Sequence, residues 1–222
     1  MKRNSPEVLS SSVYLWLRNH KNWLAPTLPY LAVWAGLFLF KSAWFALIGF
    51  HAAILLALVP GRPGIPIHIL FKSKHSKWIM ASILLCGGAG IGLYFLWGIF
   101  GIANDLPAQL KSIGLTSSSW PLFIAYFALV NPFVEEYFWR AYLGGATKTL
   151  YVSDLIYAGF HGMILINKAP LPSIVFALAI LTFVGWFWRQ LYRKDEGLLA
   201  AVLGHMAADF TILLTIYRMS SI

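Results

Sequence analysis

The chain has 222 residues, of which 59% are hydrophobic and 11% charged, and its mean hydropathy is +0.70. A soluble domain averages about 45–50% apolar residues, so this composition excludes an ordinary soluble protein and predicts an integral membrane protein. Long apolar runs without alternating polarity favour membrane helices over a transmembrane β-barrel. The formal charge of +9 does not indicate nucleic-acid binding, because the lysines and arginines fall in short segments between apolar runs, where they set membrane orientation.

The first segment, residues 1–23, carries four basic residues and no cleavage site follows it, so we expect no cleaved signal peptide. Ser5-Pro6-Glu7 is typical of a helix start, and the apolar residues after it predict an N-terminal interfacial helix along the membrane surface.

The rest of the chain predicts an all-α, polytopic helical membrane protein with about seven transmembrane helices. A membrane crossing needs about 20 apolar residues. The candidate runs are roughly residues 24–40, 42–59, 78–100, 120–142, 151–166, 171–188 and 198–217. We find no internal repeat, so we expect a single domain over residues 1–222, with a motif-bearing core at about 120–217. Cys86 is the only cysteine, which we interpret as a small core residue.

Orientation follows from the basic residues. Most of the 17 lysines and arginines fall on one side of the predicted spans if the N-terminus is cytoplasmic, which predicts that topology in what we expect to be a bacterial cell membrane. The Pro/Gly-rich loop at 60–66 and the basic run at 72–77 then form a cytoplasmic connection.

The fourth run contains two adjacent carboxylates and an arginine, Glu135, Glu136 and Arg140. A charge in a membrane helix costs roughly 2.5–3.5 kcal/mol on insertion scales, so it usually pairs inside the bundle or marks a reaction site. Glu136 and Arg140 are four residues apart in the favourable order for a helical ion pair. Glu135 points about 100° further round the helix, which leaves it free for chemistry. The alternative is that all three form a buried structural cluster.

Further polar residues lie at a similar predicted depth on the last helices. At 1.5 Å per residue, Glu135, His161, His205 and Asp209 all lie about 10–16 Å from the cytoplasmic ends of their helices. We interpret His51 as a satisfied core histidine and Asp154 as a helix cap. Near this layer, Gly159, Gly162 and Gly204 are expected to permit close approach.

The known hydrolase signatures H-E-x-x-H, G-x-S-x-G and G-x-G-D are missing from the sequence. What remains is a glutamate with histidines. A carboxylate helped by an imidazole can take a proton from water as it attacks a carbonyl, an effect worth roughly 10²- to 10⁴-fold. A second histidine can donate to the developing oxyanion.

Residues 135–140 fit the pattern E-E-x-x-x-R, residues 157–161 resemble F-x-x-x-H, and residues 205–209 fit H-x-x-x-[N/D]. In this order on successive apolar helices, they resemble the CAAX protease and bacteriocin-processing (CPBP or Abi) family of intramembrane glutamic endopeptidases. The resemblance covers about residues 120–217.

The resemblance implies a role for each matched position. Glu135 would activate the water with help from His161, His205 and Asp209 would bind the oxyanion, and Glu136 and Arg140 would support the site. Tyr157 stands where phenylalanine is usual and adds a hydroxyl that needs a partner. Asp209 stands where prenyl-protein endopeptidases have asparagine, and an ionised aspartate accepts hydrogen bonds without donating any.

The leading hypothesis is therefore a CAAX-protease-like intramembrane endopeptidase that faces the cytoplasm and cleaves a peptide or lipidated protein tail, with no cofactor. Its partners would be that substrate and membrane lipid, and no nucleic acid. One alternative is a zinc-dependent hydrolase, because Glu135, His161, His205 and Asp209 are also metal-ligand types. The other is a non-enzymatic scaffold, immunity factor or proton-coupled carrier that uses the polar cluster structurally.

Overall fold

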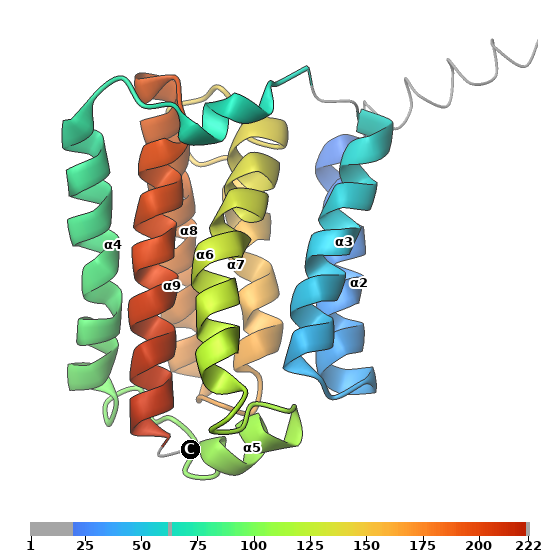
Figure 1. The fold of residues 1–222 in the computed structure, drawn as a ribbon, viewed down its shortest axis with the longest axis vertical. Helices are drawn as coiled ribbons and strands as arrows, with labels where there is room; N and C mark the ends of the chain where they lie inside the picture. The colour runs from blue at the N-terminus through green and yellow to red at the C-terminus, as the bar shows by residue number, and fades with distance from the viewer. Residues whose placement is uncertain (1–19, 62–63, 221–222) are drawn as a thin grey trace, which may run out of the picture.

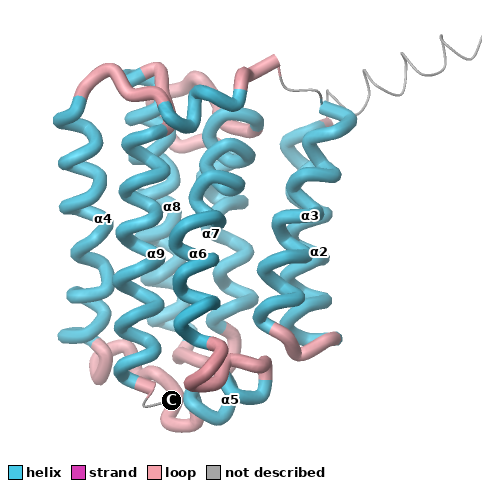
Figure 2. The backbone as a smooth tube through the Cα atoms, viewed as in Figure 1, coloured by secondary structure: helices cyan, strands magenta, loops and turns pink. Residues whose placement is uncertain are grey.

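The computed structural model describes residues 20–61 and 64–220 of the chain (Figure 1). These residues form helices joined by loops, with no strand among them (Figure 2). The predicted N-terminal interfacial helix falls mainly on residues 1–19, outside the described residues.

Each of the seven predicted runs contains one long helix. The elements are α2 (Lys21–Trp34) continued by the π-helix η1 (Ala35–Leu39), α3 (Ala43–Gly61), the 3₁₀-helix η2 (Ile67–Phe71), α4 (Ser76–Leu96), α5 (Leu106–Ser112), α6 (Trp120–Glu136) continued by the π-helix η3 (Tyr137–Tyr142), α7 (Val152–Leu165), α8 (Leu171–Asp195) and α9 (Leu199–Met219). Helices α5 and η2 were not predicted from the sequence, because both are too short to show an apolar period.

Within the described residues, three helices are long and apolar enough to cross a membrane, namely α4, α8 and α9. The segments 23–39, 43–59 and 152–165 are shorter apolar helices. The helical fold is thus confirmed, and seven crossings remain a prediction.

Helix α9 lies against α4 on one side and α6 on the other, while α2 and α3 pair with each other at the far side of α6 and α7 (Figure 1). Small residues allow the closest of these contacts. A Cβ atom on Gly204 of α9 would overlap the Ser82 hydroxyl of α4, and one on Gly90 would overlap the backbone of Thr211. The Thr215 hydroxyl also donates to the Gly90 carbonyl at 3.0 Å. Close backbone approach of this kind is how membrane helices associate without a hydrophobic driving force.

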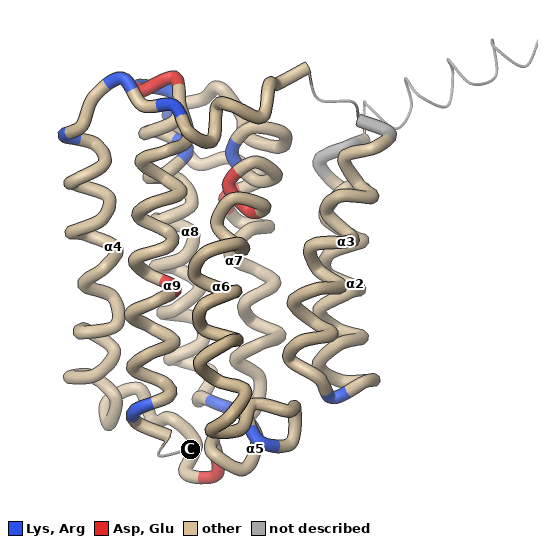
Figure 3. The backbone as a smooth tube through the Cα atoms, viewed as in Figure 1, with Lys and Arg blue, Asp and Glu red and all other residues tan. Residues whose placement is uncertain are grey.

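Lysines and arginines gather at the two ends of the bundle, and acidic residues occur within α6 and α9 (Figure 3). Two of the 17 basic residues used for the orientation prediction, Arg140 and Arg189, are buried and ion-paired. Buried, paired charges do not report on topology as loop charges do, so the orientation prediction has to rest on the remaining basic residues.

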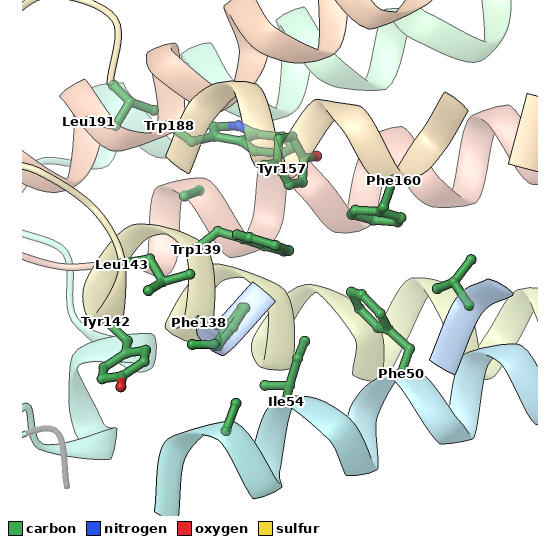
Figure 4. Close-up of a cluster of buried hydrophobic side chains, with 14 of the residues drawn as sticks. Phe50, Ile54, Phe138, Trp139, Tyr142, Leu143, Tyr157, Phe160, Trp188 and Leu191 are labelled. Atoms are coloured by element: carbon green, nitrogen blue, oxygen red, sulfur yellow. The ribbon is translucent and has the colours of Figure 1, made fainter. Parts of the chain in front are cut away.

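An aromatic cluster packs between α3, α6, η3, α7 and α8 (Figure 4). Trp139 stacks on Phe160 with ring centroids 6.2 Å apart, and Phe50 approaches Phe160 at 5.0 Å. Trp139, Tyr157 and Trp188 are each 1% exposed, and Tyr157 and Trp188 contact the Arg140 guanidinium of η3.

The α4–α9 contact gives a stability prediction. Gly204→Ala is expected to lower the free energy of unfolding by about 1–3 kcal/mol, because the added methyl group has no room beside Ser82. Gly88→Ala is the matched control, because a Cβ there meets no atom within 4 Å. It should be neutral or stabilising by up to about 1 kcal/mol, since alanine favours a helix over glycine. Thermal unfolding in detergent micelles measures both variants, and equal effects would contradict the packing argument.

Candidate active site

The three charged residues of the E-E-x-x-x-R pattern lie where α6 passes into the π-helix η3, one turn after Pro132. Glu135, Glu136 and Arg140 are no more than 2% exposed. The predicted Glu136–Arg140 ion pair is present, with Oε2 and Nε 3.2 Å apart. Short π-helical segments inside α-helices occur frequently at functional sites. The pattern therefore places three charges at a local irregularity of the helix.

Arg140 lies between two aromatic rings. Its guanidinium carbon is 3.9 Å from the centre of the Tyr157 ring and 5.1 Å from that of Trp188. None of its nitrogens has a hydrogen-bond partner among the described residues, and the contact with Glu136 lacks hydrogen-bond alignment. The charge is thus balanced by one carboxylate and two ring faces, which attract a cation electrostatically.

His205 of α9 joins the same carboxylate from the other side. Its Nδ1 lies 2.8 Å from Glu136 Oε1, and its Nε2 lies 3.5 Å from Asp209 Oδ2. The imidazole stacks on Trp188 with a centroid distance of 4.6 Å, and the Trp188 indole donates to Ser82 Oγ at 3.1 Å. Glu136 therefore links α6 to η3 and α9. Both its partners, Arg140 and His205, contact the ring of Trp188.

Glu135 differs from its neighbour. It is 2% exposed, and its Oε2 has no hydrogen-bond partner among the described residues. Buried polar atoms are nearly always hydrogen-bonded, so an exception requires an explanation such as a catalytic role or an ordered water. Oε2 of Glu136 also lacks a hydrogen bond, but it lies 3.2 Å from Arg140 Nε, whereas Glu135 forms no ion pair among the described residues.

His161 lies one turn after Tyr157 on α7. Its Nδ1 donates to the Tyr157 carbonyl at 3.1 Å, an arrangement that leaves Nε2 as the acceptor. The Tyr157 ring stands between the two histidines, 5.4 Å from the His161 ring and 6.3 Å from the His205 ring. The structure describes no hydrogen bond between His161 and Glu135. Glu136 thus contacts Arg140 and His205, and His205 contacts Asp209. His161 is separated from His205 by the Tyr157 ring.

A second polar chain reaches Asp209 from α6 and α3. The Asn131 amide nitrogen donates to Asp209 Oδ2 at 3.4 Å, and its oxygen lies 3.0 Å from His51 Nε2. His51 Nδ1 in turn lies 3.2 Å from the Tyr126 hydroxyl. Because the carboxylate of Asp209 needs a donor, Asn131 must accept from His51, so His51 carries its proton on Nε2 and accepts from Tyr126. The chain has one consistent direction, from Tyr126 to Asp209.

No role for Asn131 was predicted from the sequence. The available signal was its position one helical turn before Glu135, because an amide four residues from a carboxylate shares its face. His51 is buried and hydrogen-bonded, as predicted for a core histidine, and its link to Asp209 through Asn131 was not predicted.

Asp154 and Arg189 form a separate buried ion pair beside the loop that follows η3. Asp154 accepts from the Tyr151 amide at 2.9 Å, which confirms the predicted helix cap. It also pairs with Arg189 at 2.7 Å, and Arg189 donates to the carbonyls of Gly145, Thr147 and Thr149. These hydrogen bonds hold loop 143–151, which connects η3 to α7.

Two of the three predicted glycine contacts are close. A Cβ atom on Gly159 would lie 2.5 Å from the Tyr30 hydroxyl, and Gly204 meets Ser82, whereas Gly162 has only an ordinary contact with Leu178 at 3.7 Å. Cys86 is buried at 4% exposure, as predicted for a small core residue.

The zinc alternative requires several ligands to converge on one metal ion. No three histidine, cysteine, aspartate or glutamate side chains in this part are grouped so that they hold one metal ion. Structural and catalytic zinc sites need at least three such ligands converging on one point.

Comparison with known proteins identifies one family. Residues 117–211 match the family model described as Type II CAAX prenyl endopeptidase Rce1-like. The matched segment contains all three short patterns on α6–η3, α7 and α9. No curated protein and no solved structure matches the chain.

The buried ion pair gives a prediction. Glu136→Gln and Arg140→Met should each destabilise the fold by about 3–5 kcal/mol, because each leaves an uncompensated buried charge. The double variant should lose clearly less than the sum of the two single losses, since neither charge remains. Denaturant unfolding of the three variants in micelles measures this coupling, and strictly additive losses would show that the two charges do not stabilise each other.

Proposed function

We propose that this chain is an intramembrane endopeptidase of the type II CAAX prenyl endopeptidase family, whose model matches residues 117–211, and that Glu135 activates a water molecule. The observation that carries this proposal is the contrast between two adjacent carboxylates. Glu136 is held by Arg140 and His205, while Oε2 of Glu135 is buried without a partner. A carboxylate oxygen of that kind is a suitable acceptor for a proton of bound water.

In the proposed reaction, the water oxygen attacks the peptide carbonyl carbon while Glu135 takes its proton. The carbonyl oxygen becomes an oxyanion, the carbon–nitrogen bond then breaks, and Glu135 returns the proton to the leaving amine. His161 supports this step with Nε2, which remains an acceptor because Nδ1 donates to the Tyr157 carbonyl. Tyr157 and Arg140 hold the geometry, since the guanidinium lies on the tyrosine ring.

Oxyanion stabilisation needs donors, which an ionised Asp209 does not supply. His205 Nδ1 already donates to Glu136, so Nε2 can donate as well only in the imidazolium form, which two neighbouring carboxylates favour. In that form, the Nε2 contact with Asp209 at 3.5 Å is long enough to be exchanged for a better acceptor. Asn131 offers the second hydrogen of the amide that already donates to Asp209. We therefore assign the donors to His205 and Asn131, with Asp209 orienting both.

The substrate class follows from the family and the surroundings. A prenyl endopeptidase family acts on lipidated protein tails, and a site buried among apolar helices suits a peptide delivered from the membrane. In the predicted topology, loop 143–151 opens on the cytoplasmic side. The competing scaffold, immunity-factor or carrier function would use the same polar cluster without chemistry.

The decisive variant is Glu135→Gln, which keeps the size of the side chain and removes the base. We expect loss of cleavage with unchanged abundance in the membrane. The measurement is a comparison of peptide termini in cells that express either form, with Glu196→Gln as the control, because Glu196 is an exposed loop carboxylate. Termini that appear with the wild type and the control alone would identify the substrate as well.

If the termini are identical and Glu135→Gln cells behave as wild type, the scaffold function is favoured instead. Repeating the assay on purified protein with a strong chelator distinguishes a zinc-dependent hydrolase from an enzyme that needs no metal. Full activity under chelation is expected for a water activated by Glu135 alone.

Asn131 gives an independent test of the oxyanion assignment. Asn131→Leu should lower kcat by about 10²- to 10³-fold with little change in KM, as found when an oxyanion donor is removed. Asn131→Asp combined with Asp209→Asn, which exchanges the amide and the carboxylate, should recover part of that loss. Full kcat in Asn131→Leu would remove the residue from the mechanism and leave the Glu135 proposal standing.

A further inference from the structure

A cavity of about 360 Å³ lies outside the candidate site, between the start of α4 and the last turns of α8. Its walls include two tryptophans, Trp78 and Trp186, and the apolar Leu191. Its rim carries three cations, Lys148, Arg193 and Lys194. No acidic residue lines it.

The three rim cations have no acidic partner among the described residues, in which all acid–base pairs involve other groups. The nearest acids in sequence are already engaged. Glu196 pairs with Lys74 at 2.7 Å, and buried Asp195 accepts from the backbone amides of Lys74 and His75 at 3.0 and 2.9 Å. The cavity therefore has uncompensated positive charge, which is complementary to an anion.

A second, larger hollow of about 560 Å³ adjoins the first at Trp186, which lines both. It runs along α7 and α8 and is lined by Leu150, Leu155, Ala179, Thr182 and Phe183. Leu155 and Phe183 are 55% and 53% exposed, so this face has no covering from the described part of the chain. A cationic cavity thus continues into an apolar groove on the outer surface of a helix long and apolar enough to cross a membrane.

Trp186 is fixed at the junction, because its indole nitrogen donates to the Lys148 carbonyl at 2.8 Å. The ammonium groups of Lys77 and Lys194 lie 5.2 and 5.5 Å from the centre of the Trp78 ring. Tryptophan with lysine is the usual pairing at the level of lipid headgroups. Basic pockets of this kind between membrane helices bind anionic headgroups.

We propose that this two-part surface, which we call the α8 lipid site, binds one anionic phospholipid. Its phosphate lies among Lys148, Arg193 and Lys194, and an acyl chain lies in the groove below Trp186. The occupant must be amphipathic, because a free phosphate would leave the groove empty and a neutral lipid would leave the three cations unpaired. The proposal does not depend on the proposed peptidase activity.

The same contacts connect the lipid site to the loop after the candidate active site. Thr147, next to Lys148, accepts from Arg189 at 2.7 Å and from Gln190 at 3.2 Å through its carbonyl. A lipid held by Lys148 would therefore tie loop 143–151 to α8 more firmly. A ligand that binds only the folded state stabilises it by mass action, so thermal unfolding reports the binding.

The test uses the full chain, delipidated in a neutral detergent. Its unfolding temperature is measured against increasing phosphatidylglycerol, and against phosphatidylcholine with the same acyl chains. We expect at least tenfold tighter apparent binding of phosphatidylglycerol. Lys148→Gln/Arg193→Gln/Lys194→Gln should lose that preference, whereas Lys41→Gln/Lys111→Gln/Arg218→Gln, which removes three charges at the other end of the bundle, should keep it.

Two further arms identify the occupant. Ala179→Trp, which fills the groove and leaves every charge in place, should weaken phosphatidylglycerol binding at least severalfold. Excess glycerol phosphate should not displace the lipid. Equal binding of the two lipids, an unaffected rim variant, or complete displacement by glycerol phosphate would each overturn the proposal.

Discussion

The structure of the site depends on the buried carboxylate of Glu136. One oxygen faces Arg140 of η3 and the other faces His205 of α9, so a single side chain fixes the relative positions of two helices. A buried ion pair is stable only where its partners offset the cost of desolvation. Here Trp188 supports both partners, because His205 stacks on it and the Arg140 guanidinium lies 5.1 Å from its ring centre. With Glu136 fully engaged, the adjacent Glu135 is the carboxylate left for other work.

Both carboxylates lie in the interior, although adjacent residues of an α-helix diverge by about 100°. The two glutamates and Arg140 are at most 2% exposed, so α6 is buried on more than one side at this level. The π-helix η3 follows directly after Glu136 and carries Arg140. Pro132 precedes this junction by one turn and weakens the regular hydrogen-bond ladder there. An irregular helix of this kind is common at functional sites, and its position was not evident from the sequence.

The sequence predicted features that depend on residues close to one another along the chain. Long apolar runs predicted the seven long helices, and the four-residue spacing predicted the Glu136–Arg140 pair, because both depend on neighbours along one helix. The pairs that cross between helices were not predicted. Asn131 with Asp209, and Asp154 with Arg189, depend on how each helix is rotated and how deeply it sits, which no local pattern specifies. Arg189 in particular was counted among the basic residues used for the orientation prediction, since a basic residue near a helix end has the same local pattern whether it is buried or exposed.

The hydrogen bonds that lead to Asp209 all run in the same donor-to-acceptor direction. Donors run from Tyr126 through His51 and Asn131 toward Asp209, whose carboxylate also faces His205. Within the described residues, Glu136 Oε2 and the Arg140 nitrogens also form no hydrogen bond, but they face each other as an ion pair at 3.2 Å. Oε2 of Glu135, one helical turn from Asn131, has neither a hydrogen bond nor an ion pair there. The surrounding order is therefore best understood as the support that holds one reactive carboxylate in place, because rigid, satisfied neighbours are what a preorganised site requires.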